Sequence, residues 1–466
     1  MTQRGAAAPD ATPDVTVVVA VYNTMPYLER CLSSLAEQSI GHDRLEVVAV
    51  DDGSTDGSGE VLDRYAARYP SVFTVIHQEN SGGPAAPSNR ALDVAGGRYV
   101  YFLGADDYLA PEALERMVAF ADEHGSDVVV GRMEGVNGRF VARGLFGSDQ
   151  ADVDLYGPHL RWQLSNTKLF NRELIEKLGL RYREDMAFGS DQPFTLTACV
   201  HARRISVLSS YTCYYAVKRE DSSNMSYRTP YVDRLGCIRE MMRAVADLVP
   251  AGRPRDTLLT RHFAWEIPRL LRPELLERPV AEQREVCAAV RAIADEWLND
   301  AILDSLSVSS RVRLSAAVRE DVDLLAAVVR DDADERLPVH LDGGEAFARY
   351  SGFRSSDLPD SLFRLAPGGV TQRLSAGVRV NAVAWSRSAL VLDLDVPLVG
   401  PDAGSALSVS LRRLDGEGHD GQPRASVTSR AGESGCSVRV TIGRASLAAA
   451  GPATWQVRLG GALRDG

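Results

Sequence analysis

The sequence has 466 residues and a formal net charge of −11, with 45% hydrophobic and 25% charged residues. This length favours two or three domains over a single hydrophobic core. The acidic balance argues against a surface that binds nucleic-acid phosphates or anionic membranes, since both partners attract excess positive charge.

The N-terminal segment, residues 1–13, is polar and rich in Ala and Pro, and it predicts a disordered leader. It contains no hydrophobic segment of the secretory kind. The apolar runs elsewhere are all shorter than the roughly 20 residues that a membrane-spanning helix needs. We therefore expect a cytoplasmic protein without a transmembrane segment.

Residues 14–132 alternate between apolar runs rich in Val and segments with apolar residues at helical spacing. The apolar runs predict strands at 14–22, 45–54, 73–78, 98–107 and 127–132. The segments between them predict helices at 25–39, 59–70, 86–97 and 110–125. Such alternation predicts an α/β domain with a mostly parallel sheet, here assigned to residues 14–230, in which ligands bind beyond the carboxyl ends of the strands.

The pattern changes twice in the second half of the chain. Residues 231–338 have apolar residues at helical spacing and predict a helical linker region. Residues 339–466 consist of short β-type runs separated by Gly, Pro, Asp and Ser, and predict a C-terminal all-β, sandwich-like domain.

Three predicted strands end in polar side chains: Tyr22 and Asn23, then Asp51 and Asp52, then Asp106 and Asp107. In a parallel sheet these strand ends meet at one edge. The turn after the first strand, "VYNTMPYLE", contains no glycine. A dinucleotide-binding fingerprint is therefore excluded at this position, and the chain has no P-loop motif.

The pair Asp106 and Asp107 ends a buried strand with two like charges, and a divalent cation shared with a substrate diphosphate would neutralise them. We therefore predict Asp106 as a ligand of Mg²⁺ or Mn²⁺. The alternative is that Asp107, followed by Pro111 and Glu112, opens the next helix as a cap.

Several motifs in order carry a resemblance to a known family: "TVVVAVYNTMPYLERCLSSLAEQS", "LEVVAVDDGSTDGS", "NSGGPAAPSNRALDVAGGRYVYFLGADD" and "GSDQPF". Together they resemble the family 2 glycosyltransferases, which have the GT-A (Rossmann-like) fold for binding nucleotide sugars. The resemblance covers about residues 14–225. It departs from the family pattern at Gly104, where the family often has an Asp, and at Ser88, where it often has an Arg.

The resemblance implies a set of nucleotide-sugar-binding residues, with Asp51 or Asp52 contacting a uracil ring and Asp106 also holding the metal. These residues are Val21, Tyr22, Asn23, Asp51, Asp52, Asn89, Asp106, Asp107, Lys218 and Arg219. For Lys218 and Arg219 the implied contact is with the diphosphate, and the alternative is a solvated charged loop.

The resemblance also implies that Asp191, in "FGSDQPF", is the catalytic base that takes a proton from the acceptor hydroxyl. Asp191 could equally open the helix that "DQPFTLTACVHA" predicts, and both assignments are compatible. The next candidates for the base are Glu184 and Asp185.

The implied function is an inverting, metal-dependent hexosyl- or N-acetylhexosaminyltransferase that moves a sugar from a UDP-sugar to a hydroxyl of a glycan or cell-wall polymer. The layout is similar to that of soluble transferases acting on teichoic acids, which implies a polyol-phosphate acceptor. For the C-terminal β domain it implies either a homo-oligomer formed through this domain or, equally, binding of the acceptor glycan. The alternatives are a non-catalytic glycan- or nucleotide-binding protein with a degenerate site, favoured by Gly104, and a transferase using another nucleotide sugar.

Overall fold

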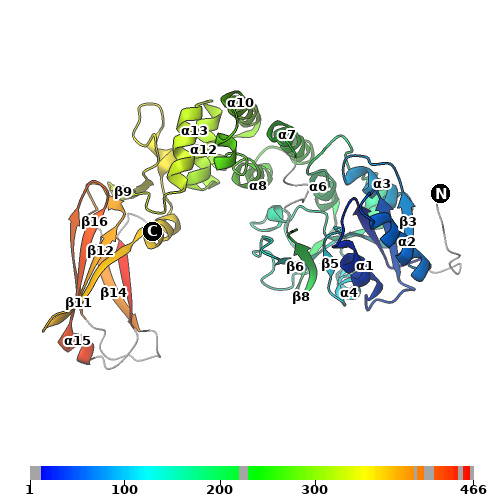
Figure 1. Cartoon of the computed structure of the whole chain (residues 1–466), viewed down its shortest axis with the longest axis horizontal. Coiled ribbons are helices and arrows are strands. Elements are labelled where there is room, and N and C mark those ends of the chain that lie inside the picture. The colour runs from blue at the N-terminus through cyan, green and yellow to red at the C-terminus, as the bar shows by residue number, and fades with distance from the viewer. Residues whose placement is uncertain (1–11, 220–228, 404–406, 414–423, 450–454, 462–466) are drawn as a thin grey trace. The chain divides into compact units, whose positions relative to one another are not determined.

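The computed structural model describes residues 12–219, 229–403, 407–413, 424–449 and 455–461 (Figure 1). The chain separates into two compact units, residues 1–262 and 263–466. Most of the predicted leader, residues 1–11, lies outside the described residues.

The first unit is built on an eight-stranded sheet in the order β3-β2-β1-β4-β7-β6-β8-β5. Strands β3, β2, β1 and β4 run parallel, and their alternation with helices confirms the predicted α/β fold. The strands are β1 (Val15–Val21), β2 (Leu45–Asp51), β3 (Phe73–His77), β4 (Tyr99–Phe102), β5 (Tyr108–Leu109), β6 (Val128–Val136), β7 (Leu169–Asn171) and β8 (Ile205–Val217).

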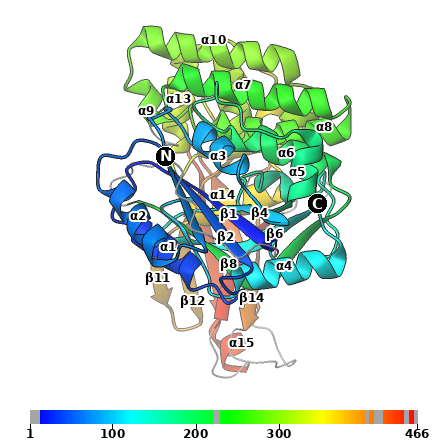
Figure 2. The same cartoon turned by 90° about the vertical axis from the view of Figure 1, so that its right-hand side faces the viewer.

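Both faces of the parallel strands are covered by helices, which explains why these strands are apolar throughout. Side chains of α1, α2 and α4 share a core with one face of the sheet, while α3 packs on β1 and β2 from the other. Figure 2 shows α1 and α2 beside β1 and β2, and α3 at a separate place from these two helices. These helices are α1 (Leu28–Ala36), α2 (Ser58–Arg68), α3 (Ala85–Leu92) and α4 (Ala113–His124).

The sequence did not predict β7 and β8, which join the sheet through antiparallel and parallel pairing with β6. The strand predicted at 98–107 ends at Phe102, so Asp106 and Asp107 lie in the turn between β4 and β5. The remaining helical segments of this unit are η1 (Leu160–Trp162), α5 (Arg172–Leu178), α6 (Asp191–His201), α7 (Tyr231–Leu248) and α8 (Arg253–Arg261).

The second unit begins with helices and continues with strands, as the change of periodicity predicts. Its helices are α9 (Pro273–Leu276), α10 (Val280–Trp297), α11 (Asp300–Ser305), α12 (Val308–Val318), α13 (Val322–Asp332), η4 (Asp360–Phe363), α14 (Pro367–Gly377) and α15 (Arg444–Ala449). Its strands are β9 (Val339–Asp342), β10 (Glu345–Ala348), β11 (Arg379–Trp385), β12 (Ala389–Val396), β13 (Leu398–Val399), β14 (Leu407–Arg413), β15 (Ala425–Ala431), β16 (Cys436–Gly443) and β17 (Trp455–Gly461).

The strand-rich part of the second unit shares its core with the helices before it. Val308, Val312 and Val328 of α12 and α13 are buried in one cluster with apolar residues of β9, β12 and β16. The main sheet is antiparallel, in the order β11-β12-β16-β15. Among the described residues, no helix has both the length and the hydropathy that crossing a membrane requires.

Candidate active site

The carboxyl ends of β1, β2 and β3 lie side by side, because Val21 pairs with Asp51 and Asp51 pairs with His77 in parallel register. The end of β4 follows on the other side of β1, where the N–H of Leu103 donates to the carbonyl of Val18. The predicted meeting of the polar strand ends at one edge of the sheet is therefore present.

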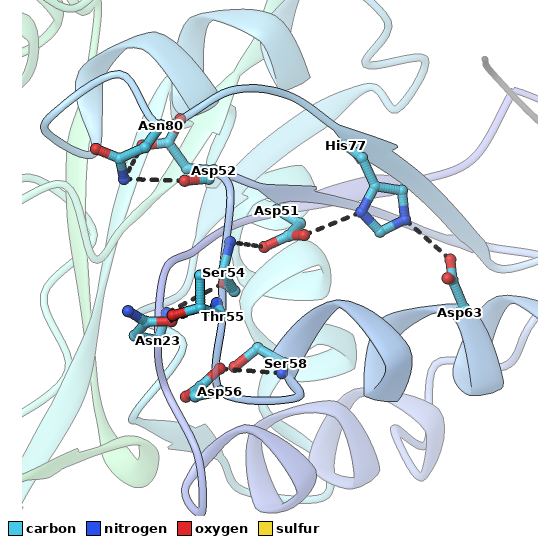
Figure 3. Close-up of polar contacts among 10 residues, drawn as sticks. All are labelled: Asn23, Asp51, Asp52, Ser54, Thr55, Asp56, Ser58, Asp63, His77 and Asn80. Carbon is cyan, nitrogen blue, oxygen red and sulfur yellow. Dashed lines mark hydrogen bonds and ion pairs between the residues drawn. The ribbon is translucent and has the colours of Figure 1, made fainter.

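Asn23 connects the segment after β1 with the "DDGS" turn after β2 (Figure 3). Its backbone N–H donates to Ser54 Oγ at 3.1 Å, and its Oδ1 accepts from the N–H of Thr55 at 2.8 Å. Asn23 has φ +46°, a left-handed conformation that Asn tolerates better than most residues. The preceding Tyr22 is 45% exposed, so its ring is available to a ligand.

Asp51 is the last residue of β2 and Asp52 follows it, and their carboxylates have different hydrogen-bond partners. Asp51 lies on the α2 side, where Oδ1 accepts from the N–H of Ser54 at 3.0 Å and Oδ2 lies 3.0 Å from His77 Nδ1 (Figure 3). Asp52 is buried, and its carboxylate accepts hydrogen bonds from Gln78 and Ser81. Both carboxylates thus stabilise the segments that follow β2 and β3.

Asp107 does not cap the next helix, as the alternative interpretation proposed. Its carboxylate accepts hydrogen bonds from the Tyr214 hydroxyl and from the N–H of Val217, at 2.6 Å, while α4 has no side-chain cap. Burial raises the pKa of Asp107 to about 7, and the charge of Asp106 acts in the same direction. Ionisation of both carboxylates at once is therefore unfavourable unless further positive charge lies nearby.

Gly104 explains how Asp107 reaches this position. A Cβ atom at residue 104 would lie 2.8 Å from Asp107 Oδ2 and 3.2 Å from the Tyr214 hydroxyl. The space beside Gly104 is filled by the Asp107–Tyr214 pair. A larger residue at 104 would need Asp107 to move.

Asp106 forms an ion pair with Arg219, with Arg219 Nε 2.7 Å from Asp106 Oδ2. Arg219 follows the end of β8, and its guanidinium also lies 5.8 Å from the centre of the Tyr27 ring. Lys218 is exposed, and its N–H donates to the carbonyl of Val136. Residues 220–228, which continue the predicted phosphate-binding segment, lie outside the described residues.

The side chain of Asn89 on α3 is engaged with the segment before α6. Its Oδ1 accepts from the N–H of Tyr182 at 2.8 Å, and its Nδ2 donates to the carbonyl of Tyr182 and to Glu184 Oε1. Asp185, the other acidic residue of this segment, pairs with Arg183. Asn89 therefore joins α3 to the segment that carries Glu184.

Asp191 is the first residue of α6, and its neighbourhood combines burial with positive charge. Burial raises the pKa of Asp191, and the charges of Arg261 and Lys168 act against this shift. Lys168 is fully buried, donates from Nζ to the carbonyl of Ser165 at 2.5 Å, and has its pKa lowered to about 8 by burial. Arg261 donates to Gln192 Oε1 at 2.6 Å.

A divalent cation fits the chemistry of this edge of the sheet. Two adjacent carboxylates, Asp106 and Asp107, lie together, and a cation would oppose the burial and the Asp106 charge that raise the pKa of Asp107. No group of three or more His, Cys, Asp or Glu side chains arranged for a metal occurs in the described part of the chain. Two carboxylates completed by substrate phosphates are the usual protein contribution for Mg²⁺.

Four residues of this region were not predicted as site residues from the sequence: His77, Tyr214, Lys168 and Arg261. Lys168 had one signal, because the chain has only three lysines among 52 basic residues. His77, Tyr214 and Arg261 belong to this region because of contacts between segments that are far apart in the sequence, and a local sequence motif does not predict such contacts.

Two family descriptions match the sequence. Residues 16–179 match Glycosyl transferase family 2, and residues 232–329 match the Glycosyl transferase TarS linker domain. The poly(ribitol-phosphate) beta-glucosyltransferase of Bacillus spizizenii is 29% identical over 357 residues, covering 75% of this chain and 56% of the relative. The poly(ribitol-phosphate) beta-N-acetylglucosaminyltransferase TarS of Staphylococcus aureus is 36% identical over 258 residues, covering 54% and 44%.

Solved structures of S. aureus TarS have the same fold. Residues 1–349 of TarS in complex with UDP-GlcNAc match with a TM-score of 0.63 and 29% identity, covering 72% of this chain and 97% of that chain. A further TarS crystal structure matches 96% of this chain with a TM-score of 0.65 at 24% identity, which supports the fold alone. The chain spans about half the length of the curated relatives it matches.

Proposed function

We propose that the protein is an inverting glycosyltransferase that moves a sugar from a UDP-sugar to a hydroxyl of a poly(ribitol phosphate)-type polymer. Residues 16–179 match Glycosyl transferase family 2, and the chain is similar to TarS and to a poly(ribitol-phosphate) beta-glucosyltransferase. One observation carries the proposal. The strand-end residues gather at one edge of the sheet, in a domain that matches a TarS structure in complex with UDP-GlcNAc.

The donor site in this proposal lies at the ends of β1, β2 and β4. Val21, Tyr22 and Asn23 hold the nucleoside, with Asp51 or Asp52 recognising the uracil ring. Lys218 and Arg219 neutralise the diphosphate, and the Arg219–Asp106 ion pair supports this because Arg219 already lies beside the acidic turn. Asn89 on α3 also contacts the donor in this proposal, and its hydrogen bonds to residues 182–184 hold its side chain in place.

Asp106, with Asp107 beside it, would hold Mg²⁺ or Mn²⁺ at this edge. The ion would supply positive charge that offsets the charge of the departing diphosphate. Asp106 would contact the ion in place of its ion pair with Arg219, and the Tyr214 hydrogen bond would keep Asp107 in position.

In the proposed reaction, Asp191 removes the proton of the acceptor hydroxyl. The hydroxyl oxygen forms a bond to the anomeric carbon while the bond from that carbon to UDP breaks, so the anomeric configuration inverts. The positive charges of Lys168 and Arg261 favour the ionised, basic form of Asp191 against its burial.

The test is transfer to poly(ribitol phosphate) from UDP-glucose and from UDP-GlcNAc, with Mn²⁺ and with EDTA. The relatives are named for these two sugars, so the assay also decides between them. Asp106→Asn should lower metal-dependent transfer by on the order of 100-fold, because metal stabilisation of several kcal/mol corresponds to such a factor. Glu123→Gln removes an exposed carboxylate of α4 and should leave transfer unchanged.

Two results would contradict the proposal. UDP binding without transfer from any donor would favour the alternative of a binding protein with a degenerate site. Unchanged metal-dependent transfer by Asp106→Asn would remove Asp106 from the metal site.

A further inference from the structure

We propose that His77 is a positioning residue of the nucleotide site, whose imidazole ring joins Asp51 to Asp63 and thereby holds the 51–55 turn in the shape that receives a nucleoside diphosphate. This inference rests on the proposed function, since it assigns the turn to the donor site. His77 acts through Asp51 and is not placed in contact with the ligand.

The ring of His77 bridges three elements. His77 is the last residue of β3, and its Nδ1 lies 3.0 Å from Oδ2 of Asp51, the last residue of β2. Its Nε2 lies 3.0 Å from Oδ1 of Asp63 on α2. Figure 3 shows the imidazole between the two carboxylates. The helix that covers the sheet is thus connected to the strand end by one side chain.

The bridge continues from Asp51 into the turn. The second carboxylate oxygen of Asp51 accepts from the N–H of Ser54 at 3.0 Å, and Ser54 Oγ accepts from the N–H of Asn23 at 3.1 Å. Asn23 in turn accepts from the N–H of Thr55 at 2.8 Å. Rotation of the Asp51 carboxylate would therefore disturb the backbone of the turn and the segment after β1 together.

Gly59 provides the space for the Asp51–His77 contact. A Cβ atom at residue 59 would lie 2.9 Å from Asp51 Oδ2 and 3.6 Å from Cε1 of His77. Glycine is unfavourable within a helix, and Gly59 is the second residue of α2. A glycine is needed at residue 59 because α2 approaches the buried Asp51 carboxylate too closely for a side chain.

The protonation state of His77 changes the bridge. The hydrogen bond to Asp63 on α2 raises the pKa of His77 above its ordinary value, and the hydrogen bond to Asp51 on β2 acts in the same direction. A protonated ring donates from both nitrogens, whereas a neutral ring donates from one. The His77 side chain is 46% exposed, so its ring is accessible to protons from solvent. The bridge is therefore complete below the pKa of His77 and weakens as the pH rises through it.

The experiment measures the Kd of UDP for the full-length protein by calorimetry, at constant Mn²⁺, from about pH 5.5 to about pH 8.5, the range in which His titrates. Wild type is compared with His77→Gln, which carries both donor hydrogens on one nitrogen instead of on the two separate nitrogens of a ring, and which does not titrate. Because a phosphate group also titrates near pH 6, the readout is the ratio of the two Kd values at each pH. We expect His77→Gln to bind about two- to tenfold more weakly at the acid end, as loss of one hydrogen bond predicts, with the ratio approaching one at the alkaline end.

Two further variants complete the design. Asp63→Asn changes an exposed carboxylate, so folding is not at risk; it should lower the pKa of His77 and move the decline of UDP affinity to lower pH. His201→Gln removes an exposed imidazole on α6 that contacts only a backbone carbonyl among the described hydrogen bonds, and it should follow wild type at every pH.

The failures are distinguishable. A Kd ratio that is constant across the pH range would show a purely structural contribution of His77, and a ratio of one throughout would show none; either result overturns the inference. A pH profile of Asp63→Asn identical to that of wild type overturns it as well. If wild type and His201→Gln do not bind UDP at all, the proposed function fails and the inference falls with it.

Discussion

At the scale of single residues, the acidic side chains of the candidate site differ in how their charge is compensated. Asp51 and Asp52 accept hydrogen bonds from neighbouring turns and from His77. Asp106 pairs with Arg219, whereas Asp107 has two donors and a raised pKa. Burial disfavours the charged form of Asp191 and raises its pKa, whereas the positive charges of Arg261 and Lys168 favour the charged form. For Asp107 and Asp191, burial raises the pKa and neighbouring donors or cations oppose that shift, a combination that is common in functional sites.

The prediction at this scale concerns Asp191. Asp191→Asn keeps the shape of the side chain but cannot accept the proton of the acceptor hydroxyl. Transfer should fall by about 10²–10⁴-fold at saturating donor, which is the usual contribution of a general base, while the Kd of UDP should change little. Because burial raises the pKa of Asp191, the ionised form accumulates only above an elevated pKa, and wild-type transfer should increase as the pH rises through it.

Glu184→Gln is the matched control for this prediction, because Glu184 is an exposed acid of the same region, bonded to Asn89. It should reduce transfer far less than Asp191→Asn. Loss of transfer by Glu184→Gln with an active Asp191→Asn would assign the base to Glu184. Activity in both variants would contradict the proposed single displacement.

The sequence predicted the strand-end residues because each belongs to a local motif. It did not predict His77 or Tyr214, since their importance comes from contacts with Asp51 and Asp107, which are 26 and 107 residues away in sequence. The sequence showed that Gly104 departs from the family pattern. It did not show that a side chain at residue 104 would collide with the Asp107–Tyr214 pair.

At the scale of elements, the parallel part of the sheet was predictable because its strands are buried on both faces and read as continuous apolar runs. Strand β8 was missed although it has 13 residues. Its sequence, "ISVLSSYTCYYAV", mixes polar and aromatic residues and shows neither a continuous apolar run nor a regular alternation. Its second half pairs with β6 and with the two-residue strand β5. That half is what places Tyr214 and Arg219 beside the acidic turn.

The prediction at this scale concerns the connection from α3 to the segment before α6. Asn89→Ala leaves the N–H and carbonyl of Tyr182 without their partner and should lower the free energy of unfolding by about 1–2 kcal/mol, the value for partly buried hydrogen bonds. Thermal and urea unfolding measure this loss. UDP affinity measured on the same variant decides whether Asn89 also contacts the donor.

Arg90→Ala is the control, because Arg90 is the next residue of α3 and is exposed. It should leave both stability and UDP affinity close to wild type. Weaker UDP binding by Asn89→Ala with unchanged stability would favour direct donor contact, whereas lost stability with unchanged affinity would favour a purely structural contribution.

At the scale of the whole molecule, the change from alternating to helical to β-type periodicity predicted the order of the structural classes along the chain. Periodicity could not reveal which elements share a core. Val308, Val312 and Val328 lie in the helical segment but are buried with residues of the strand-rich region. Tyr350 and Ser351 are hydrogen-bonded to Asp332 and Asp331 at the end of α13. The helices α12 and α13 therefore depend on the strand-rich region for part of their stability.

This dependence predicts the behaviour of a chain that ends after Asp332. Every residue assigned to the donor site lies between Val21 and Arg219, and among the described residues the buried core cluster of the parallel sheet contains none beyond Ala216. The shortened chain should therefore bind UDP with a Kd within about twofold of that of the full chain, as expected for distant, independent changes. Its helices α10–α13 should unfold at a lower temperature, since each of the three valines loses burial worth about 1.5 kcal/mol or more.

Calorimetric unfolding together with UDP titration tests both parts of this prediction. The full chain should show more than one transition, because units with separate cores need not unfold together. In the shortened chain, the transition that UDP shifts upward should keep its position, and the other should weaken or disappear. Shortening that abolished UDP binding would instead show that residues after 332 are needed to form the donor site, and an unchanged thermogram would show that α12 and α13 are stable without the strands that cover them.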